Sequence, residues 1–297
     1  MKVLLIYNPS SGNGRAGGML PRVEAAFREW GIGYELQLSR HAGHIPELVG
    51  GADFTRYDAL VLAGGDGTLF EGINGYFRNP SPRRLPIGVL PIGTGNAFAR
   101  DLRLHHSRWE EALALLRAGH IRRIDVGCFR ANGQEHYFLN ILGLGFVADA
   151  TRTANRLKSL GNLAYTLGVF HRIALHRLSY LTLEVDGRTL ERACVFLEVA
   201  NTCYTSNFFI APQALPDDGL LDVVLLHPMP RRQLVWHFPK VLDGTHLHMP
   251  QVETFRIRRM RVHTRRPRHL CPDGEILGTT PVEIECLPRA VEVFWPR

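Results

Sequence analysis

Short apolar runs alternate with helical patterns through the first 125 residues of this 297-residue chain. The runs expected to be strands are residues 3–7, 34–38, 59–63 and 87–90, and the expected helices include residues 19–30 and 67–77. Strands and helices that alternate in this way build a parallel sheet covered on both faces. We therefore predict an α/β domain over residues 1–125.

A helix and a strand mark the end of this domain. Ser107 followed by Glu110 predicts a capping box, in which the serine begins a helix that runs to about Arg117. Residues 121–129 have the pattern of a strand that leaves the domain.

The second half, residues 126–297, has a different pattern. Its strand-like runs are residues 180–185, 193–200, 220–226, 255–262 and 282–287. Asp186-Gly187 between two runs is a strong hairpin signal. Helical patterns remain at residues 144–156, 163–171 and 231–241. We expect a mainly antiparallel β domain, with its last strand a candidate to return to the first domain.

Three polar loops with glycine follow the first, third and fourth expected strands. They are Asn8-Pro9-Ser10-Ser11-Gly12, Gly64-Gly65-Asp66-Gly67-Thr68 and Gly93-Thr94-Gly95-Asn96. In an open α/β sheet, ligands bind outside the carboxyl ends of the strands, where such loops meet. A strand-to-helix junction also offers free N–H groups and the positive end of the helix dipole to a phosphate. The loops together predict one nucleotide site.

Individual side chains refine this interpretation. Asp66 is placed to orient magnesium or a hydroxyl, and Ser39, at the end of the second strand, offers a hydroxyl at the same edge. A plain turn capped by Asp66 and Thr68 is the alternative for the second loop.

A competing motif runs through the first loop. Gly12, Gly14 and Gly17 match the G-x-G-x-x-G fingerprint of dinucleotide binding. That fingerprint requires an acidic residue at the end of the second strand to hold a ribose. Because Leu38 and Ser39 stand there instead, the match is weak.

Composition limits the remaining classes. Five scattered cysteines without a C-x-x-C pair argue against a disulfide framework and a zinc knuckle. The longest uncharged apolar stretches, residues 137–148 and 159–170, are shorter than the roughly 18 to 20 residues that span a bilayer. The first residues resemble a strand more than a signal peptide, so a cytoplasmic enzyme is expected. The formal net charge of +7 favours anionic partners, but no nucleic-acid-binding motif accompanies it.

Five motifs, taken in order, resemble the diacylglycerol kinase catalytic-domain family. They are the three loops above, then Asp217-Asp218-Gly219-Leu220-Leu221-Asp222-Val223 and finally Asp273-Gly274-Glu275. The family includes bacterial lipid kinases, sphingosine kinases and ceramide kinases, and it is distantly similar to NAD kinases. The resemblance implies a Rossmann-like α/β nucleotide-binding domain followed by a β-sandwich-like domain. It also implies an ATP- and Mg²⁺-dependent lipid kinase.

The resemblance implies that ATP lies in a cleft lined by residues 64–68. The implied contacts are Asn8, Pro9, Ser10, Ser11, Gly12, Ser39, Gly64, Gly65, Asp66, Gly67, Thr68, Leu69, Phe70, Glu71 and Thr94. This chain departs from the family at two of them, with Ser39 where threonine is frequent and Phe70 where asparagine is usual. Because the backbone does most of the cradling, binding should survive both changes.

A structural magnesium site is implied in the second domain. The resemblance assigns it to Asp218 with the backbone carbonyls of Leu215 and Leu220. Such hard oxygen ligands suit magnesium. A type I turn rich in aspartate and glycine is the alternative.

The implied catalytic residues are Glu275 as general base, Asp273 beside it, and Asp66. One carboxylate is enough to accept the proton of a lipid hydroxyl, because phosphoryl transfer depends mostly on positioning and charge neutralisation. A plain hairpin turn at residues 272–275 is the alternative.

The implied acceptor is diacylglycerol or a related lipid at the membrane surface, with peripheral membrane contact and a homodimer as further expectations. We expect Phe146, Phe208 and Phe209 to help line the lipid channel, with core packing as the plainer role. Arginines in residues 255–266 form either a contact for anionic headgroups or a solvated face. NAD kinase is the rival enzyme, and a non-catalytic nucleotide- and lipid-binding regulator is the rival from another class.

Overall fold

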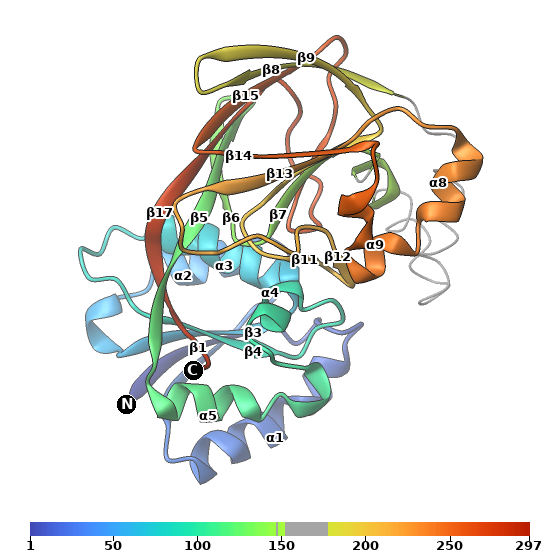
Figure 1. Ribbon diagram of the computed structural model, residues 1–297. Helices are drawn as coiled ribbons and strands as arrows, with labels where there is room; N and C mark the ends of the chain where they lie inside the picture. Colours follow the sequence, from blue (N-terminus) through green and yellow to red (C-terminus); the bar gives the residue numbers. More distant parts are fainter. Residues whose placement is uncertain (147, 152–177) are drawn as a thin grey trace. The chain divides into compact units, whose positions relative to one another are not determined.

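Figure 1 shows the computed structural model, which describes residues 1–146, 148–151 and 178–297. The chain divides into two compact units, one of Met1–Val126 with Arg289–Arg297 and one of Gly127–Pro288. Two long strands, β5 (Ile121–Ala131) and β17 (Val282–Phe294), contribute residues to both units. The predicted helix at residues 163–171 lies outside the described residues.

The first unit is built on a parallel sheet in the order β2-β1-β3-β4. Its strands are β1 (Lys2–Tyr7), β2 (Gly33–Leu38), β3 (Ala59–Gly64) and β4 (Ile87–Pro91). The end of β17 adds a parallel strand beside β4, where Val293 pairs with Ile87. All six residues of β3 are buried, as expected for a sheet covered on both faces. The predicted α/β architecture is confirmed.

Helices connect these strands. They are α1 (Arg15–Glu29), α2 (His44–Gly50), α3 (Asp66–Arg78), α4 (Ala97–Asp101) and α5 (Glu111–Ala118), with 3-10 turns η1 (Phe54–Arg56) and η2 (His106–Arg108). In the described ranges, no helix is long and apolar enough to cross a bilayer.

The predicted capping box at Ser107 is wrong. Helix α5 begins at Glu111, after Glu110, and has no side-chain cap. Ser107 belongs to η2, and its N–H and hydroxyl both lie within hydrogen-bond distance of Nδ1 of His105, at 3.3 and 2.7 Å. The histidine therefore caps an additional turn that the serine pattern did not reveal.

The second unit is a sandwich of antiparallel strands. One sheet has the order β14-β13-β10-β7-β16. In the other sheet β15 pairs with the first part of β17, β8 pairs with β15 and β9 with β8, and β5 and β6 also belong to it. The strands are β6 (Gln134–Phe138), β7 (Ile141–Gly145), β8 (Ser179–Val185), β9 (Arg188–Cys194), β10 (Phe196–Ala200), β13 (Leu221–Leu226), β14 (Val252–Ile257), β15 (Arg259–Thr264) and β16 (Leu270–Pro272). A short hairpin joins β11 (Tyr204–Thr205) to β12 (Phe208–Phe209).

Two apolar layers stabilise this unit. One lies between the sheets and includes Leu197 and Val223 from the first sheet and Leu183 and Val262 from the second. The other covers the opposite face of the five-stranded sheet. There Phe196 packs in a layer with residues of the segment that holds α8 (Arg231–His237), α9 (Lys240–Asp243) and η4 (Thr245–His248).

Several predicted boundaries in this unit are wrong. The run 193–200 is divided at Val195 between β9 and β10, and the run 255–262 is divided at Arg258 between β14 and β15. In both cases the chain passes from one sheet to the other within one residue. The predicted helix 231–241 is broken between α8 and α9, next to Pro239, whose ring nitrogen has no N–H to donate. The helix predicted at residues 144–156 begins later than expected, because β7 continues to Gly145. Residues 146 and 148–151 are helical, and residues 152–156 lie outside the described residues.

The predicted hairpin at Asp186-Gly187 is confirmed. Val185 pairs with Arg188 across the β8–β9 ladder, which leaves a two-residue turn. Asp186 has φ 46° and Gly187 has φ 81°, as a type I′ turn requires.

Candidate functional site

The first and second glycine loops meet through Thr68. Nδ2 of Asn8 donates to Oγ1 of Thr68 at 2.9 Å, and the hydroxyl of Ser11 lies 3.4 Å from the same oxygen. Asn8 also shapes its own loop, because its Oδ1 accepts the N–H of Ser10 at 3.0 Å. Polar residues predicted from two strand ends are thus brought together.

The second and third loops interlock through their backbones. The carbonyl of Gly64 accepts the N–H groups of Ile92 and Gly93, each at 3.1 Å. A Cβ atom added to Gly93 would lie 2.3 Å from Cα of Gly65, which real structures do not tolerate. Glycine is therefore required at position 93 so that the two loops can touch.

Asp66 fixes the second loop to the third. It lies in the first turn of the 13-residue helix α3, and its Oδ1 accepts the N–H of Ala97 at 2.6 Å. Gly65 caps this helix without a side-chain hydrogen bond. Because the first N–H groups of a helix have no partner within it, this end of α3 attracts anions.

The remaining loop residues lie open at the same edge. Those with at least partial exposure are Pro9, Ser10, Gly12, Gly67 and Thr94. This edge of the sheet is therefore reachable from solvent.

Leu69 and Phe70 are placed differently from the other predicted contacts. Their side chains are buried, with exposures of 3% and 7%. The N–H of Leu69 donates to the carbonyl of Gly65, and Nδ2 of Asn74 donates to the carbonyl of Phe70. Both residues support the helix that carries the loop, and their side chains do not face a ligand in solvent.

Ser39 and Glu71 organise the loop after β2. The N–H of Ser39 donates to the carbonyl of Tyr7 at 2.9 Å, which continues the pairing of β1 with β2. Oε1 of Glu71 accepts the N–H of Gly43 at 2.9 Å. Glu71 therefore holds the start of α2 beside α3.

Arg15 was missed by sequence reasoning. It is the first residue of α1, and its guanidinium donates to the carbonyl of Gly93 at 3.3 Å. A cation at the N-terminus of a helix is electrostatically unfavourable in isolation, so its position there favours an anionic ligand beside it. The signal in the sequence was a basic residue directly after the glycine-rich first loop.

In the second unit, the carboxylate of Asp273 is buried and fully occupied. It accepts the backbone N–H groups of Leu139, Asn140 and Ile141 at 3.0, 2.9 and 3.0 Å. Burial raises the pKa of Asp273 to about 6, although the three N–H donors act to lower it. The side chain thus clamps the connection between β6 and β7.

Glu275 follows in an exposed turn. Its N–H donates to the carbonyl of Pro272 at 2.8 Å, and the two central residues, Asp273 and Gly274, have φ 46° and 87°. This is a type I′ turn, which leaves the side chain of Glu275 accessible to solvent.

Asp218 lies in a turn beside an arginine. Its Oδ1 accepts the N–H of Leu220 at 3.0 Å, and its Oδ2 lies 3.4 Å from the guanidinium of Arg256. The same guanidinium lies 3.4 Å from Oδ1 of Asp222, its direct cross-strand partner. Both oxygens of Asp218 already face donors, so these residues fit a divalent cation poorly. Among the described residues, no group of three or more His, Cys, Asp and Glu side chains could hold a metal.

An apolar cavity lies within the second unit. Its lining residues are Phe146, Val195, Phe196, Leu226, Met229, Leu234, His237, Phe238, Val241, His246, Met249 and Val252. Phe146, predicted for the lipid channel, is among them. Phe208 packs edge-on against Phe238 at 5.7 Å, and Phe209 stacks on Tyr204 at 4.7 Å, so neither reaches the cavity wall.

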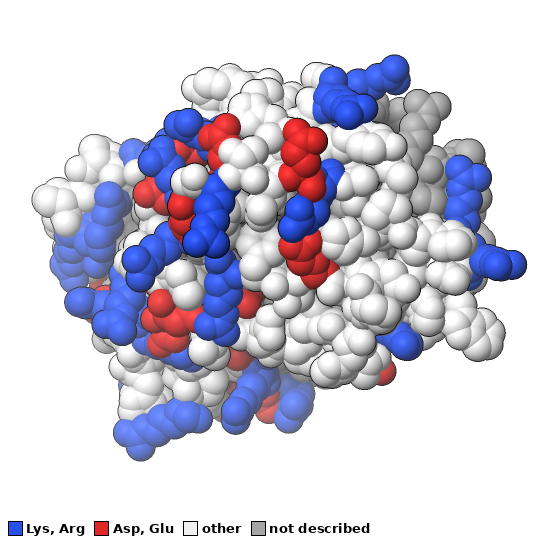
Figure 2. Space-filling view, turned by 45° about the horizontal axis from the view of Figure 1, so that its top comes forward, with Lys and Arg blue, Asp and Glu red and all other residues white. Residues whose placement is uncertain are grey.

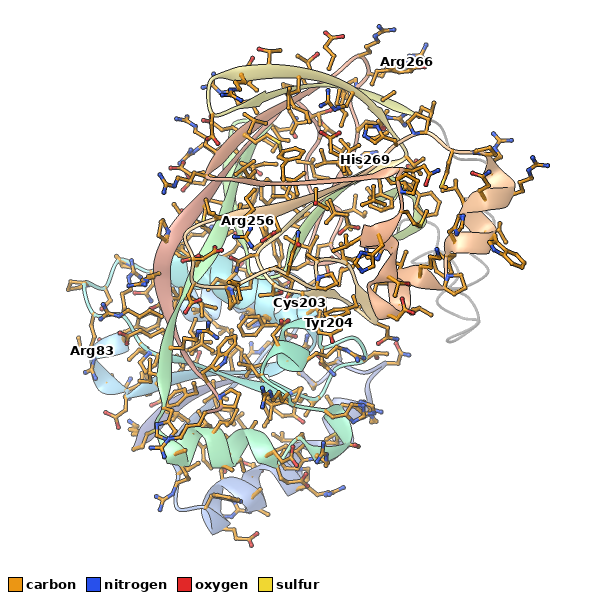
Figure 3. All side chains as sticks on the ribbon, viewed as in Figure 1. Arg83, Cys203, Tyr204, Arg256, Arg266 and His269 are labelled. Carbon is orange, nitrogen blue, oxygen red and sulfur yellow. The ribbon has the colours of Figure 1, made fainter. Side chains whose placement is uncertain are left out.

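The arginines predicted for headgroup contact are partly neutralised. Arg259 and Arg261 form ion pairs with Glu283 and Glu184 on neighbouring strands. Arg256, labelled in Figure 3 on β14, faces the two aspartates described above. The left side of Figure 2 shows the same intermixture, with blue side chains interleaved with red ones.

Known families match both parts of the chain. Residues 2–129 match the diacylglycerol kinase catalytic domain, and residues 140–295 match the YegS C-terminal NAD kinase beta sandwich-like domain. A diacylglycerol kinase of Bacillus subtilis (strain 168) is 30% identical, over 99% of this chain and 96% of the relative. A diacylglycerol kinase of Mycobacterium tuberculosis (strain CDC 1551 / Oshkosh) is 27% identical, over 100% of this chain and 96% of the relative.

A solved structure also matches. It comes from Bacillus anthracis str. Sterne and carries the provisional name diacylglycerol kinase. It superposes with a TM-score of 0.78 at 26% identity and covers 99% of this chain and 97% of that one.

Proposed function

Since this chain belongs to the diacylglycerol kinase family and is a lipid kinase, we propose that it transfers the γ-phosphoryl group of magnesium ATP to the hydroxyl of diacylglycerol or a closely related lipid. In this reaction the bond between the γ-phosphorus and the bridging oxygen of ATP breaks. A new bond forms between that phosphorus and the lipid oxygen, and ADP leaves.

The observation that carries this proposal is the meeting of three glycine loops at one sheet edge. The Asn8–Thr68 bond, the Asp66–Ala97 bond and the close approach of Gly65 to Gly93 fix the loops in one arrangement before a ligand arrives. Preorganised N–H groups and a helix N-terminus are what a triphosphate requires. Arg15 adds a positive charge beside the third loop.

The general base in this proposal is Glu275, which takes the proton of the lipid hydroxyl. Its exposed carboxylate on a type I′ turn is accessible to a substrate, which supports the role. Asp273 is proposed as a positioning residue, because its carboxylate is already committed to three N–H donors. It holds the turn that presents Glu275.

Magnesium enters this proposal as part of the substrate, bound to the ATP phosphates. Asp66, partly exposed at the start of α3, is the carboxylate proposed to orient that complex. The ion would neutralise charge that develops on the transferred group. No step involves a metal at Asp218, where Arg256 already supplies the positive charge.

The apolar cavity supports a lipid acceptor over the rival NAD kinase activity. A cavity lined mainly by aromatic and aliphatic side chains favours an acyl chain, whereas the polar body of NAD would leave its hydrogen-bonding groups without partners. Phe146 is proposed to contact the chain, and Phe208 is proposed to support the wall through Phe238.

The test is transfer of labelled phosphate from magnesium ATP to a panel of lipids in mixed micelles, with NAD as a parallel acceptor. We expect label in diacylglycerol and a loss of about 100-fold or more in kcat for Glu275→Gln, as for removal of a general base. Glu191→Gln, an exposed glutamate on β9, is the matched control and should retain full activity.

Three other outcomes would contradict the proposal. Label in NAD alone would identify an NAD kinase. Intact ATP binding without label in any acceptor would indicate a regulator. Full activity of Glu275→Gln would remove the proposed base.

A further inference from the structure

Three strongly exposed large hydrophobic side chains lie close together in sequence, between positions 235 and 242 of α8 and α9. Val235 is 44% exposed, Trp236 is 81% exposed, and Leu242 is 51% exposed. Trp236 is the most exposed of all the large hydrophobic side chains that the structure describes. Isolated apolar residues on a surface need no explanation, but a cluster that includes a tryptophan does.

Basic residues surround this cluster. Arg231 and Arg232 are exposed on the first turn of α8, and Lys240 begins α9. Within the described part of the chain, none of the three forms an ion pair with an acidic side chain. The nearby carboxylate of Asp243 is occupied by the N–H and hydroxyl of Thr245, at 3.0 and 2.7 Å.

The two faces of this segment differ. Leu234, His237, Phe238 and Val241 line the apolar cavity, and none of Val235, Trp236 and Leu242 does. Within α8, helical periodicity explains the division, because Leu234 and His237 are three residues apart and share a face. The same short segment therefore has one side against the cavity and the other against solvent.

The residue types on the solvent-facing side of this segment favour one kind of partner. Tryptophan prefers the boundary between acyl chains and headgroups, where its ring is buried and its N–H stays hydrated. Unpaired arginine and lysine are attracted to anionic headgroups at roughly 1 kcal/mol each, which corresponds to about fivefold in partitioning. A protein partner of the same shape would need acidic groups to neutralise these cations, and a bilayer supplies them.

We infer that residues 231–242 form the surface that binds an anionic bilayer, with Trp236 as its interfacial anchor and Arg231, Arg232 and Lys240 as its headgroup contacts. This inference rests on the proposed function, since it places the wall of the acyl cavity directly at the lipid surface. In Figure 1, α8 lies at the right edge of the second unit, and in Figure 2 blue side chains stand at that edge next to a mostly white surface.

This surface differs from the arginine-rich strands β14 and β15. Those arginines are numerous, but Arg256, Arg259 and Arg261 are neutralised by carboxylates of the same unit. The surface around Trp236 has fewer cations and no such neutralisation among the described residues.

The experiment is sedimentation of the full chain with vesicles of phosphatidylcholine, with and without phosphatidylglycerol, in the absence of ATP. Wild type should bind the anionic vesicles and show a blue shift of tryptophan fluorescence. Trp236→Ala should abolish the blue shift and weaken binding about tenfold, and Arg231→Ala with Arg232→Ala should weaken it roughly 25-fold on anionic vesicles only.

Matched controls separate this effect from general loss of charge or tryptophan. Trp30→Ala removes the other tryptophan among the exposed large hydrophobics, 37% exposed in the first unit, and should bind as wild type. Trp236→Tyr retains an interfacial aromatic ring and should restore most of the binding, which shows that a defect of Trp236→Ala is not misfolding.

Several results would overturn the inference. Binding by Trp236→Ala equal to wild type would do so, as would loss of binding in Arg258→Glu with Arg266→Glu while the Trp236 variant still binds. A wild-type dimer that Trp236→Ala converts to a monomer, with vesicle binding unchanged, would identify the surface as an interface between copies.

Activity on a short-chain, dispersed diacylglycerol separates this inference from the proposed function. Trp236→Ala should phosphorylate that substrate as wild type does and should lose activity only on vesicles. If wild type phosphorylates neither substrate but still binds vesicles through Trp236, the proposed function fails and the membrane surface stands.

Discussion

Glu198 is a buried acid in the middle of the five-stranded sheet. It lies on β10, opposite Gly143 of β7 and Val224 of β13, and is 1% exposed. Among the described residues, nothing forms a hydrogen bond with its Oε2. Burial raises the pKa of Glu198 to about 8, so the folded protein keeps this side chain protonated at neutral pH.

This shift predicts a pH-dependent stability. In the unfolded chain the carboxyl loses its proton near its ordinary pKa of 4.5, whereas the folded protein holds it to about pH 8. The free energy of unfolding should therefore fall as the pH rises through this window, by about 1.4 kcal/mol per pH unit. Glu198→Gln should remove this slope and stabilise the protein at pH 7 by on the order of 3 kcal/mol.

Urea denaturation between pH 6.5 and 8 measures the effect. Asp273 adds to the pH dependence of the free energy of unfolding mainly below this range, because its raised pKa is about 6. Glu191→Gln, on the exposed edge of β9, is the control and should keep the wild-type slope. An unchanged slope in Glu198→Gln would show that its carboxyl ionises in the folded state.

The role of Asp273 was not predictable from the sequence, because its hydrogen-bond partners are distant in the chain. The three N–H groups that occupy Asp273 lie more than 130 positions earlier in the chain. The sequence identified both Asp273 and Glu275 as carboxylates in one turn, but only the register of β7 with β16 assigns one to a buried clamp and the other to solvent. Local pattern locates such residues, and tertiary pairing decides what they do.

At the level of elements, the pairing of β13 with β14 places Arg256 beside two aspartates. Asp222 is directly opposite Arg256 and is almost fully buried, and Asp218 is four residues earlier in the chain. Burial raises the pKa of Asp222, and the Arg256 guanidinium opposes that rise. The sheet register thus supplies an internal cation to the turn where the family resemblance implied magnesium.

Arg256→Gln should therefore destabilise the second unit, because it leaves a buried carboxylate without a countercharge. Since Arg256 is itself partly exposed, we expect roughly 1 to 2 kcal/mol. Adding Asp222→Asn should recover part of the loss. Arg258→Gln, an exposed arginine two residues further along the chain, is the control and should be nearly neutral.

The same measurement, thermal unfolding, tests for a metal. Wild type should melt at the same temperature with and without EDTA. If EDTA lowers the melting temperature of wild type but not of Asp218→Asn, a bound cation stabilises the turn and the assignment to Arg256 is wrong.

Elements were predictable where one sequence run corresponds to one strand or helix, as in the α/β unit. They were not predictable where one continuous strand-like run is divided between two sheets. Residues 193–200 form one continuous apolar run apart from Glu198, as a single buried strand would, yet Val195 separates β9 from β10. β-propensity indicates that a residue suits a strand, but it does not indicate which of two sheets that strand will join.

At the scale of the whole molecule, the C-terminal segment belongs to the first unit although it follows the second in sequence. The N–H of Trp295 donates to the carbonyl of His120 at 2.9 Å, and its ring meets Phe98 edge-on at 6.2 Å. The N–H of Arg289 donates to Oδ1 of Asp125 at 2.7 Å. The first 126 residues therefore lack part of their own core.

Truncation after Pro288 should consequently destabilise the first unit, although it changes no residue of the three glycine loops. Val291, Val293 and Phe294 are at most 5% exposed, and burying each contributes about 1.5 to 3 kcal/mol. Their joint loss, of at least roughly 5 kcal/mol, is comparable to the total stability of a typical domain. ATP binding by calorimetry should disappear, whereas removal of Arg297 alone should have no effect. If the truncated chain binds ATP and melts like wild type, residues 1–126 fold without the returning strand.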